Sequence, residues 1–244
     1  MSGRPGVTCA IMAYNEEATL ARAVEEVRAA LEATGRSYEI LVVDDGSRDA
    51  TGPLADELAA RLSAPGRRVR AIHHGQNRGP GSAIVTGVAE ATEPLYCFHP
   101  ADNQVEFADI ARAIVRLDVE DYDLLVGQRS DRRDYSNGRK LLSYGYIALA
   151  RALFGLTGFE DFNFVYVWRT ELVRRMLPLS TRGVFLCTEV LVRARDQGAR
   201  IGAFTAAYRP RVAGVSTVAR PRVVADTAVQ MLSFWNQRRR GQAR

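Results

Sequence analysis

Short apolar runs alternate with amphipathic stretches along the first half of the chain. The runs are rich in β-branched residues, which is typical of buried parallel strands. Such strands are predicted at residues 7–13, 40–43, 69–73 and 95–98. Apolar positions at helical spacing predict helices between them, at residues 18–34, 51–62 and 83–91. The alternation favours an α/β fold, with a mostly parallel sheet flanked by helices and right-handed crossovers.

The pattern changes in the second half. A helix at residues 107–117 and a strand at 123–127 continue the alternation, and an arginine-rich loop, 128–140, then precedes the apolar stretch 141–159. A cationic loop beside an apolar helix suits a protein that holds a phosphate at a lipid surface. A solvated loop followed by a core helix is the alternative interpretation.

The end of the chain is amphipathic and basic. Residues 223–235 have an apolar face, and arginines follow at 238–240. Such a helix can lie on a membrane with its arginines near anionic lipid, or dock on the protein or a partner. We predict one main domain at residues 1–222 and a helical tail at 223–244.

Polar residues follow the predicted strands at their carboxyl ends. Asp44 and Asp45 end the second run, while the first and fourth are followed by residues 14–17 and 99–104. Open α/β sheets bind ligands at this edge. The competing interpretation is an Asp-Gly turn, with Ser47 or Asp49 capping the next helix and neither carboxylate touching a ligand.

Composition narrows the classes of function. The chain has 244 residues, 47% of them apolar, and a net charge of +5 that comes from arginine, because Lys140 is the only lysine. Arginine suits bidentate phosphate contacts. A nucleic-acid role is disfavoured, because no stacking aromatics are interleaved with the arginines and the strand-end carboxylates would repel a phosphate backbone.

The cysteines and histidines lack metal-ligand spacing. Cys9, Cys97 and Cys187 lie far apart in apolar segments and are predicted to be reduced core residues. With no signal peptide and no apolar run of membrane-spanning length, the expected location is cytoplasmic, with a peripheral position on the cytoplasmic membrane face.

Together these motifs resemble the family 2 glycosyltransferases of the GT-A fold. Within that family they are similar to the polyprenol-phosphate sugar transferases of the dolichol-phosphate mannose synthase type. The resemblance covers nearly all of the chain. It rests on Ala13-Tyr14-Asn15-Glu16-Glu17, Val42-Val43-Asp44-Asp45-Gly46-Ser47 with Asp49 and Thr51, Asn77-Arg78-Gly79 with Gly81 and Ala83, Asp102-Asn103-Gln104, and Arg211 with Gly214 and Ser216.

The resemblance implies a nucleoside-diphosphate sugar as donor, linked to GDP or UDP, with Asp44 and Asp45 reading the base. It also implies Mg²⁺ or Mn²⁺ on Asp102 and Gln104, which would stabilise the departing diphosphate. The residues expected to bind the nucleotide sugar are Ala13, Tyr14, Glu16, Asp44, Asp45, Ala101 and Asp102.

The implied acceptor is a polyprenyl phosphate. Its oxygen is already ionised at neutral pH, so an inverting, in-line attack needs positioning rather than a base. Asp102, Arg129 and Arg211 are the expected catalytic residues. The arginines expected to hold the acceptor phosphate are Arg129, Arg132, Arg133, Arg139 and Arg211.

Two other functions remain open. A soluble transferase acting on a glycan or small-molecule hydroxyl would need a carboxylate base, for which Asp161 and Glu189 are the candidates. A non-catalytic nucleotide-sugar-binding protein is the other, because Pro100 stands where relatives often carry the first aspartate of an Asp-X-Asp motif. His99 would compensate as a ligand if its loop turned it inward.

Overall fold

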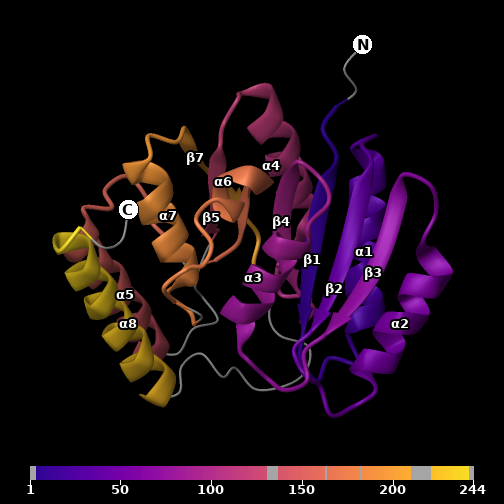
Figure 1. Cartoon of the computed structure of the whole chain (residues 1–244), viewed down its shortest axis with the longest axis horizontal. Helices are drawn as coiled ribbons and strands as arrows, with labels where there is room; N and C mark the ends of the chain where they lie inside the picture. Colours follow the sequence, from indigo (N-terminus) through magenta and orange to yellow (C-terminus); the bar gives the residue numbers. More distant parts are fainter. Residues whose placement is uncertain (1–3, 131–136, 163, 182, 210–220, 242–244) are drawn as a thin grey trace.

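The fold is a single sheet covered by helices (Figure 1). The computed structural model describes residues 4–130, 137–162, 164–181, 183–209 and 221–241. The strands are β1 (Val7–Ala13), β2 (Tyr38–Asp44), β3 (Arg67–His73), β4 (Leu95–Pro100), β5 (Leu124–Arg129), β6 (Tyr166–Arg169) and β7 (Ile201–Ala206). The helices are α1 (Leu20–Ala33), α2 (Thr51–Leu62), α3 (Pro80–Glu90), α4 (Phe107–Val119), α5 (Asn137–Phe154), α6 (Thr170–Arg174), α7 (Leu186–Asp196) and α8 (Pro221–Arg239).

The strand order within the described residues is β3-β2-β1-β4-β6-β5-β7. Strand β1 pairs in parallel with β2 and β4, and β2 pairs in parallel with β3. Strand β6 runs antiparallel to both β4 and β5, while β7 is parallel to β5. The predicted mostly parallel α/β sheet is confirmed, with one reversed strand inside it.

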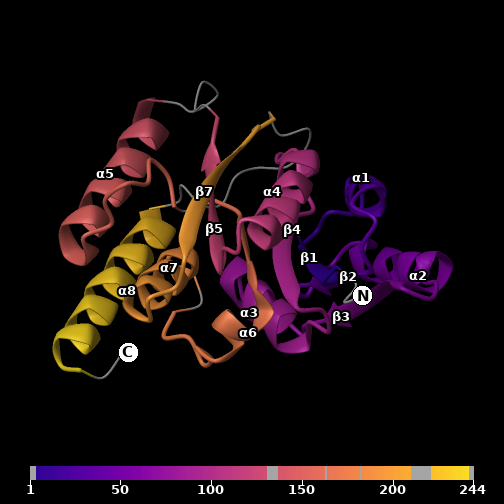
Figure 2. The ribbon, with the colours of Figure 1, turned by 90° about the horizontal axis from the view of Figure 1, so that it is seen from above.

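The core follows the apolar pattern of the sequence. Strand β2 is buried along its whole length. Helices α1 and α4 lie on one face of the sheet and α3 and α6 on the other (Figure 2). The predicted stripe on the first helix is confirmed, because Leu20, Val24, Val27 and Leu31 are fully buried. The cysteines are buried and free, as expected.

Helices α5 and α8 lie side by side beyond the end of the sheet (Figures 1 and 2). Helix α5 starts at Asn137 and ends at Phe154, so Arg139 and Lys140 belong to the helix rather than to the predicted loop. Arginine and lysine are good helix formers, which lets a helix extend beyond its apolar part.

Helix α8 docks on the protein. Phe234 is fully buried, with its ring centroid 5.7 Å from that of Phe154 and 5.8 Å from that of Phe185. Arg238 pairs with Asp196, and the Arg239 guanidinium lies 4.7 Å from the centroid of the Trp235 ring. The tail was expected either to lie on a membrane or to dock on the protein or a partner. Docking on the protein is confirmed for the face of α8 that carries Phe234. In the described part of the chain, no helix combines the length and the apolar character needed to cross a membrane.

Helix α3 packs closely on the sheet at Gly87. A Cβ there would lie 2.8 Å from the Cβ of Ala10 and would also meet the Tyr96 hydroxyl. We expect Gly87→Ala to lower the free energy of unfolding by about 1–3 kcal/mol, through overpacking. Gly138→Ala is the control, since a Cβ there has no neighbour within 4 Å and alanine favours the helix. Urea unfolding measures both, and equal stability of the two variants would contradict the prediction.

Candidate active site

Parallel pairing gathers the predicted strand ends at one edge. In the register of the ladder, Ala13 lies opposite Asp44, and Met12 opposite Pro100. Backbone hydrogen bonds continue beyond the strands: the Asp45 N–H donates to the Ala13 carbonyl at 2.8 Å, and the Ala101 N–H to the Met12 carbonyl at 3.0 Å. The residues expected at the donor site, which come from three strands, therefore share this edge.

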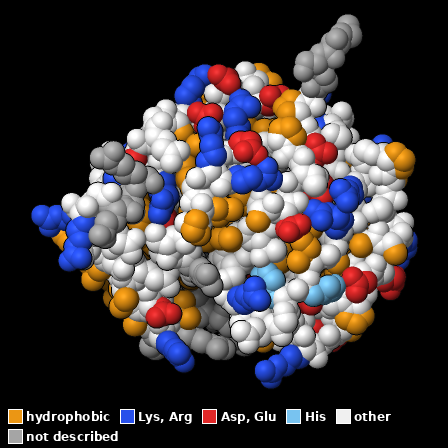
Figure 3. All heavy atoms as spheres, in the orientation of Figure 1, with side chains coloured by type: hydrophobic (Ala, Val, Ile, Leu, Met, Phe, Trp, Pro, Cys, Tyr) orange, Lys and Arg blue, Asp and Glu red, His pale blue; other side chains and the backbone are white. Residues whose placement is uncertain are grey.

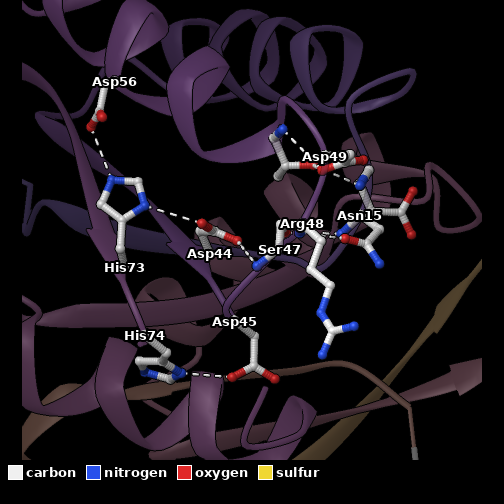
Figure 4. Close-up of polar contacts among 11 residues, drawn as sticks. Asn15, Asp44, Asp45, Ser47, Arg48, Asp49, Asp56, His73 and His74 are labelled. Atoms are coloured by element: carbon white, nitrogen blue, oxygen red, sulfur yellow. Dashed lines mark hydrogen bonds and ion pairs between the residues drawn. The ribbon is translucent and has the colours of Figure 1, made fainter. Parts of the chain in front are cut away.

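The loops after β1 and β2 interlock. The Asn15 N–H donates to Ser47 Oγ at 2.9 Å, and Asn15 Oδ1 accepts from the Arg48 N–H at 2.8 Å (Figure 4). The Glu16 N–H donates to Thr51 Oγ1 at 2.8 Å. These contacts fix the loop that carries Tyr14, whose side chain is 41% exposed. The turn interpretation of residues 44–51 is therefore incomplete, because these residues also hold the loop that carries Tyr14. The predicted cap is wrong, since the N-cap of α2 is Ala50 rather than Ser47 or Asp49.

Each of the two consecutive aspartates meets one of two consecutive histidines (Figure 4). Asp44 accepts from the Ser47 N–H at 3.0 Å and lies 3.1 Å from His73 Nδ1, whose other ring nitrogen is 3.0 Å from Asp56. Hydrogen bonds to Asp56 and Asp44 raise the pKa of His73. Asp45 is 4% exposed and lies 2.6 Å from His74 Nδ1. This pairing was missed from the sequence, because the histidines were considered as metal ligands and lack a suitable spacing.

Asp102 and Gln104 lie just beyond β4. Asp102 Oδ1 accepts from the Gln104 N–H at 3.1 Å, and Asn103 takes φ 55° with its side-chain amide on the Thr19 carbonyl. His99 is fully buried edge-on against Phe107, with no hydrogen-bond partner in the described part of the chain. His99 does not line the cavity that Asp102 and Gln104 line, so the condition under which it would replace the first aspartate is not met.

A cavity of about 600 Å³ opens beside Asp102 and Gln104. That volume is in the range of small-molecule sites, roughly 300–1,000 Å³. Its polar lining residues include Arg129 and Asp161. Its walls are mostly apolar and come largely from α5, α8 and the start of α3, with Leu142, Tyr146, Leu149, Val224, Ala228 and Met231 among them.

Arg129 is held in this cavity by charge and by aromatic rings. Its Nη1 lies 2.5 Å from Asp161 Oδ2. The guanidinium carbon is 4.2 Å from the ring centroid of Phe164 and 5.6 Å from that of Tyr208. The flat face of the guanidinium is thus used for stacking, and its edge for the carboxylate. Neither aromatic residue was expected at the site from the sequence.

The other arginines expected at the acceptor site, and the candidate base Glu189, are not placed in the cavity. Arg132, Arg133 and Arg211 lie outside the described residues, and Arg139 is in the first turn of α5. Glu189 is fully buried, and its carboxylate accepts from the Ser180 and Thr181 N–H groups and from Arg193. It does not line the cavity, so of the two candidate bases Asp161 is the one at the site.

A metal would have few protein ligands here. No group of three or more His, Cys, Asp or Glu side chains at metal-binding distance is found among the described residues. Asp102 and Gln104 both line the cavity. Their side-chain oxygens nonetheless fit Mg²⁺, which often takes one or two carboxylates and completes its shell with phosphates and water.

Comparison with known proteins agrees with this arrangement. The model of the family described as "Glycosyl transferase family 2" matches residues 8–171, more than half of the chain. The chain belongs to glycosyl transferase family 2. The family assigned by resemblance and the glycosyltransferase class are therefore confirmed.

Curated relatives of this family 2 member include two named undecaprenyl-phosphate 4-deoxy-4-formamido-L-arabinose transferase. The protein from Sodalis glossinidius is 32% identical over 180 residues, covering 74% of this chain and 54% of the relative. The one from Pseudomonas paraeruginosa is 31% identical, covering 74% and 52%. The chain thus spans about half the length of these relatives.

Solved structures of glucosyl-3-phosphoglycerate synthase from Mycobacterium tuberculosis share the fold. A complex with Mn²⁺, UDP and glucosyl-3-phosphoglycerate has a TM-score of 0.70 and 19% identity, covering 94% of this chain and 79% of that one. A complex with Mg²⁺ and UDP has a TM-score of 0.69 and 19% identity, covering 94% and 79%. They confirm the predicted GT-A fold class.

His99 should make the protein acid-sensitive. Burial, with a smaller contribution from Arg209, lowers its pKa to about 3. Because an unfolded histidine titrates near pH 6.5, only the unfolded state takes up this proton as the pH falls from about 6 to 3. We expect this group to reduce the free energy of unfolding by up to about 1.4 kcal/mol per pH unit in that window.

His99→Gln removes the titrating group. Urea unfolding at pH 7, 6, 5 and 4 should therefore show a steeper loss of stability in the wild type than in the variant. Parallel stability curves for the two proteins would contradict the assignment.

Proposed function

We propose that the protein transfers a sugar from a nucleoside-diphosphate sugar to a polyprenyl phosphate, with inversion and with Mg²⁺ or Mn²⁺, at a membrane surface. The observation that carries this proposal is the cavity, whose lining combines the polar side chains of Asp102, Gln104 and Arg129 with apolar side chains from α5 and α8. A phosphate with a hydrocarbon chain needs polar groups for the phosphate and apolar walls for the chain. The undecaprenyl-phosphate named in the two relatives supports the same acceptor class.

The donor would occupy the edge formed by β1, β2 and β4. Ala13, Tyr14, Glu16 and Ala101 would surround the nucleoside, and Asp44 and Asp45 would face the base. Guanine and uracil each carry a ring N–H that can donate a hydrogen bond to a carboxylate. The UDP in the structures with the same fold supports a uridine donor, and GDP is the alternative.

Asp102 and Gln104 would supply the protein's oxygen ligands to the metal. When bound, the metal would stabilise the negative charge on the departing nucleoside diphosphate. The protein's own contribution is the fixed position of the Asp102 loop, held by the Asn103 side chain on the Thr19 carbonyl at 3.1 Å.

Arg129 would hold the acceptor phosphate. Stacking on Phe164 and the ion pair with Asp161 fix the guanidinium in the cavity, and the apolar walls leave room for isoprene units beside it. An ionised phosphate needs no base, so the residues act by orientation and charge. Arg132, Arg133, Arg139 and Arg211 remain further candidates for this contact.

A hydroxyl acceptor is the second candidate function. It is favoured by Asp161, a carboxylate that is 3% exposed and lines the cavity next to Arg129, where a general base would be required. Glucosyl-3-phosphoglycerate in the structure with the same fold also supports a small acceptor. Transfer without lipid or detergent would separate this function from the first.

The direct test is a transfer assay with UDP- and GDP-sugars, Mn²⁺ or EDTA, and two acceptors: a short polyprenyl phosphate in detergent and 3-phosphoglycerate. We expect metal-dependent transfer to the polyprenyl phosphate. Asp102→Asn should lower kcat at least about a hundredfold, since the negative charge of the carboxylate ligand is lost. Asp121→Asn is the control: Asp121 is 72% exposed, pairs with surface arginines, and has φ 55°, which asparagine tolerates. Transfer to 3-phosphoglycerate alone would overturn the acceptor class.

Peripheral membrane contact is the final part of the proposal. Large apolar side chains are exposed on α5 and α8, among them Leu141 at 74%, Val229 at 65% and Leu232 at 51%. Hydrophobic side chains and arginines lie next to one another over α8, at the left edge of Figure 3. The expected orientation puts these helices against anionic lipid.

The double variant Val229→Glu, Leu232→Glu should reduce binding to vesicles containing anionic lipid by at least about tenfold, because two charges replace exposed apolar side chains that the lipid would bury. Neither residue lines the cavity. The matched control is Val119→Glu, which changes an equally apolar side chain, 75% exposed, on α4. Flotation of vesicles measures the bound fraction. Equal losses in both proteins would argue against a membrane role for α8.

A further inference from the structure

The carboxylate of Asp45 is almost completely used by the protein itself. Its Oδ1 lies 2.6 Å from His74 Nδ1 and accepts from the Arg78 N–H at 3.0 Å, while Oδ2 accepts from the Gly79 N–H at 2.7 Å. A carboxylate has about four acceptor positions. The contacts among the described residues therefore leave one position, and it is on Oδ2.

His74 lies between Asp45 and helix α3. Its side chain is 5% exposed, with Nδ1 on Asp45 and Nε2 2.9 Å from Thr86 Oγ1 (Figure 4 shows the ring pointing at Asp45). An ionised carboxylate can only accept, so Nδ1 carries the hydrogen. In the neutral ring, Nε2 then accepts from the Thr86 hydroxyl, and this chain of hydrogen bonds fixes both the tautomer and the orientation of the ring.

Without His74, Asp45 would be much less constrained. The last torsion of an aspartate side chain is broad, so the two backbone N–H groups alone tolerate rotation of the carboxylate. Rotation would change which oxygen, and which direction, is offered to a ligand. The backbone of residue 45 is already fixed by the hydrogen bond to Ala13, so the orientation of the carboxylate is what His74 adds.

We propose that His74 is a positioning residue for the donor, which fixes Asp45 so that the remaining acceptor position on Oδ2 meets a ring N–H of the nucleobase. The inference rests on the proposed function, because it takes the edge at Asp45 as the nucleoside site. It adds a determinant of base selectivity that acts through Asp45 without touching the nucleotide. A base whose corresponding ring nitrogen carries no hydrogen, such as cytosine, leaves this position unpaired and binds more weakly.

Two conservative variants separate positioning from packing. In His74→Asn the amide nitrogen lies the same number of bonds from Cα as Nδ1, so a donor to Asp45 is kept and the contact with Thr86 is lost. In His74→Gln the amide nitrogen corresponds to Nε2, so the contact with Thr86 is kept and the donor to Asp45 is lost. Both variants remove the ring, and a purely structural role would affect them equally.

The experiment is calorimetric titration with UDP, GDP and CDP in the presence of Mn²⁺, after thermal unfolding has shown that both variants are folded. For the nucleotide that the wild type binds best, we expect His74→Gln to weaken binding by about tenfold or more. His74→Asn should stay within about threefold of the wild type. The preference over CDP should shrink in His74→Gln and persist in His74→Asn.

Equal affinities of the two variants, whether both weakened or both unchanged, would overturn the inference. So would a loss of affinity in His74→Gln that is the same for CDP as for the preferred nucleotide. Failure of the wild type to bind any of the three nucleotides is a different result, because it contradicts the donor class of the proposed function and, with it, the inference.

Discussion

The parallel pairing of β1 with β2 and β4 is the constraint on which the site depends. Each strand contributes little by itself: Ala13, the two aspartates at the end of β2, and the loop at Asp102 are far apart in sequence. Once the register is set, with Ala13 opposite Asp44 and Met12 opposite Pro100, all of them lie at one edge. The ladder is buried on both sides, so a shift in register would also disrupt the core.

Under the proposed function, the second half of the chain would serve the acceptor. Helices α5 and α8 form a wall whose inner side lines the cavity and whose outer side exposes leucine, tyrosine and valine. The aromatic cluster of Phe154, Phe185 and Phe234 joins this wall to the body of the protein. An apolar ligand in the cavity would therefore contact helices whose outer sides also carry exposed apolar side chains.

Much of the donor half could be predicted from the sequence, because its signals are local. In the sequence, an apolar run is followed directly by Asp44 and Asp45, and another apolar run comes shortly before Asp102. The partners of these acids were not predictable in this way. His73 and His74 are brought to them by strand pairing, and their spacing alone suggests no ligand.

The acceptor half was harder to predict, since its elements meet through tertiary packing. The apolar stretch from residue 141 indicated a helix, but not that basic residues form its first turn. The periodicity of residues 223–235 revealed an apolar face without saying what it contacts. Phe164 and Tyr208 carry no motif at all, and their position against Arg129 follows from the fold.

The reversed strand β6 has a consequence for how such an enzyme diversifies. Because β6 is antiparallel to both β4 and β5, the chain leaves the sheet after β5 and returns to it at the same edge. The segment between β5 and β6, which includes α5, Asp161 and Phe164, is therefore an insertion between two neighbouring strands. Evolution can lengthen, shorten or recode this insert without touching the ladder of β1, β2 and β4. Under the proposed function, changes in this insert would alter the acceptor site and leave the donor edge unchanged.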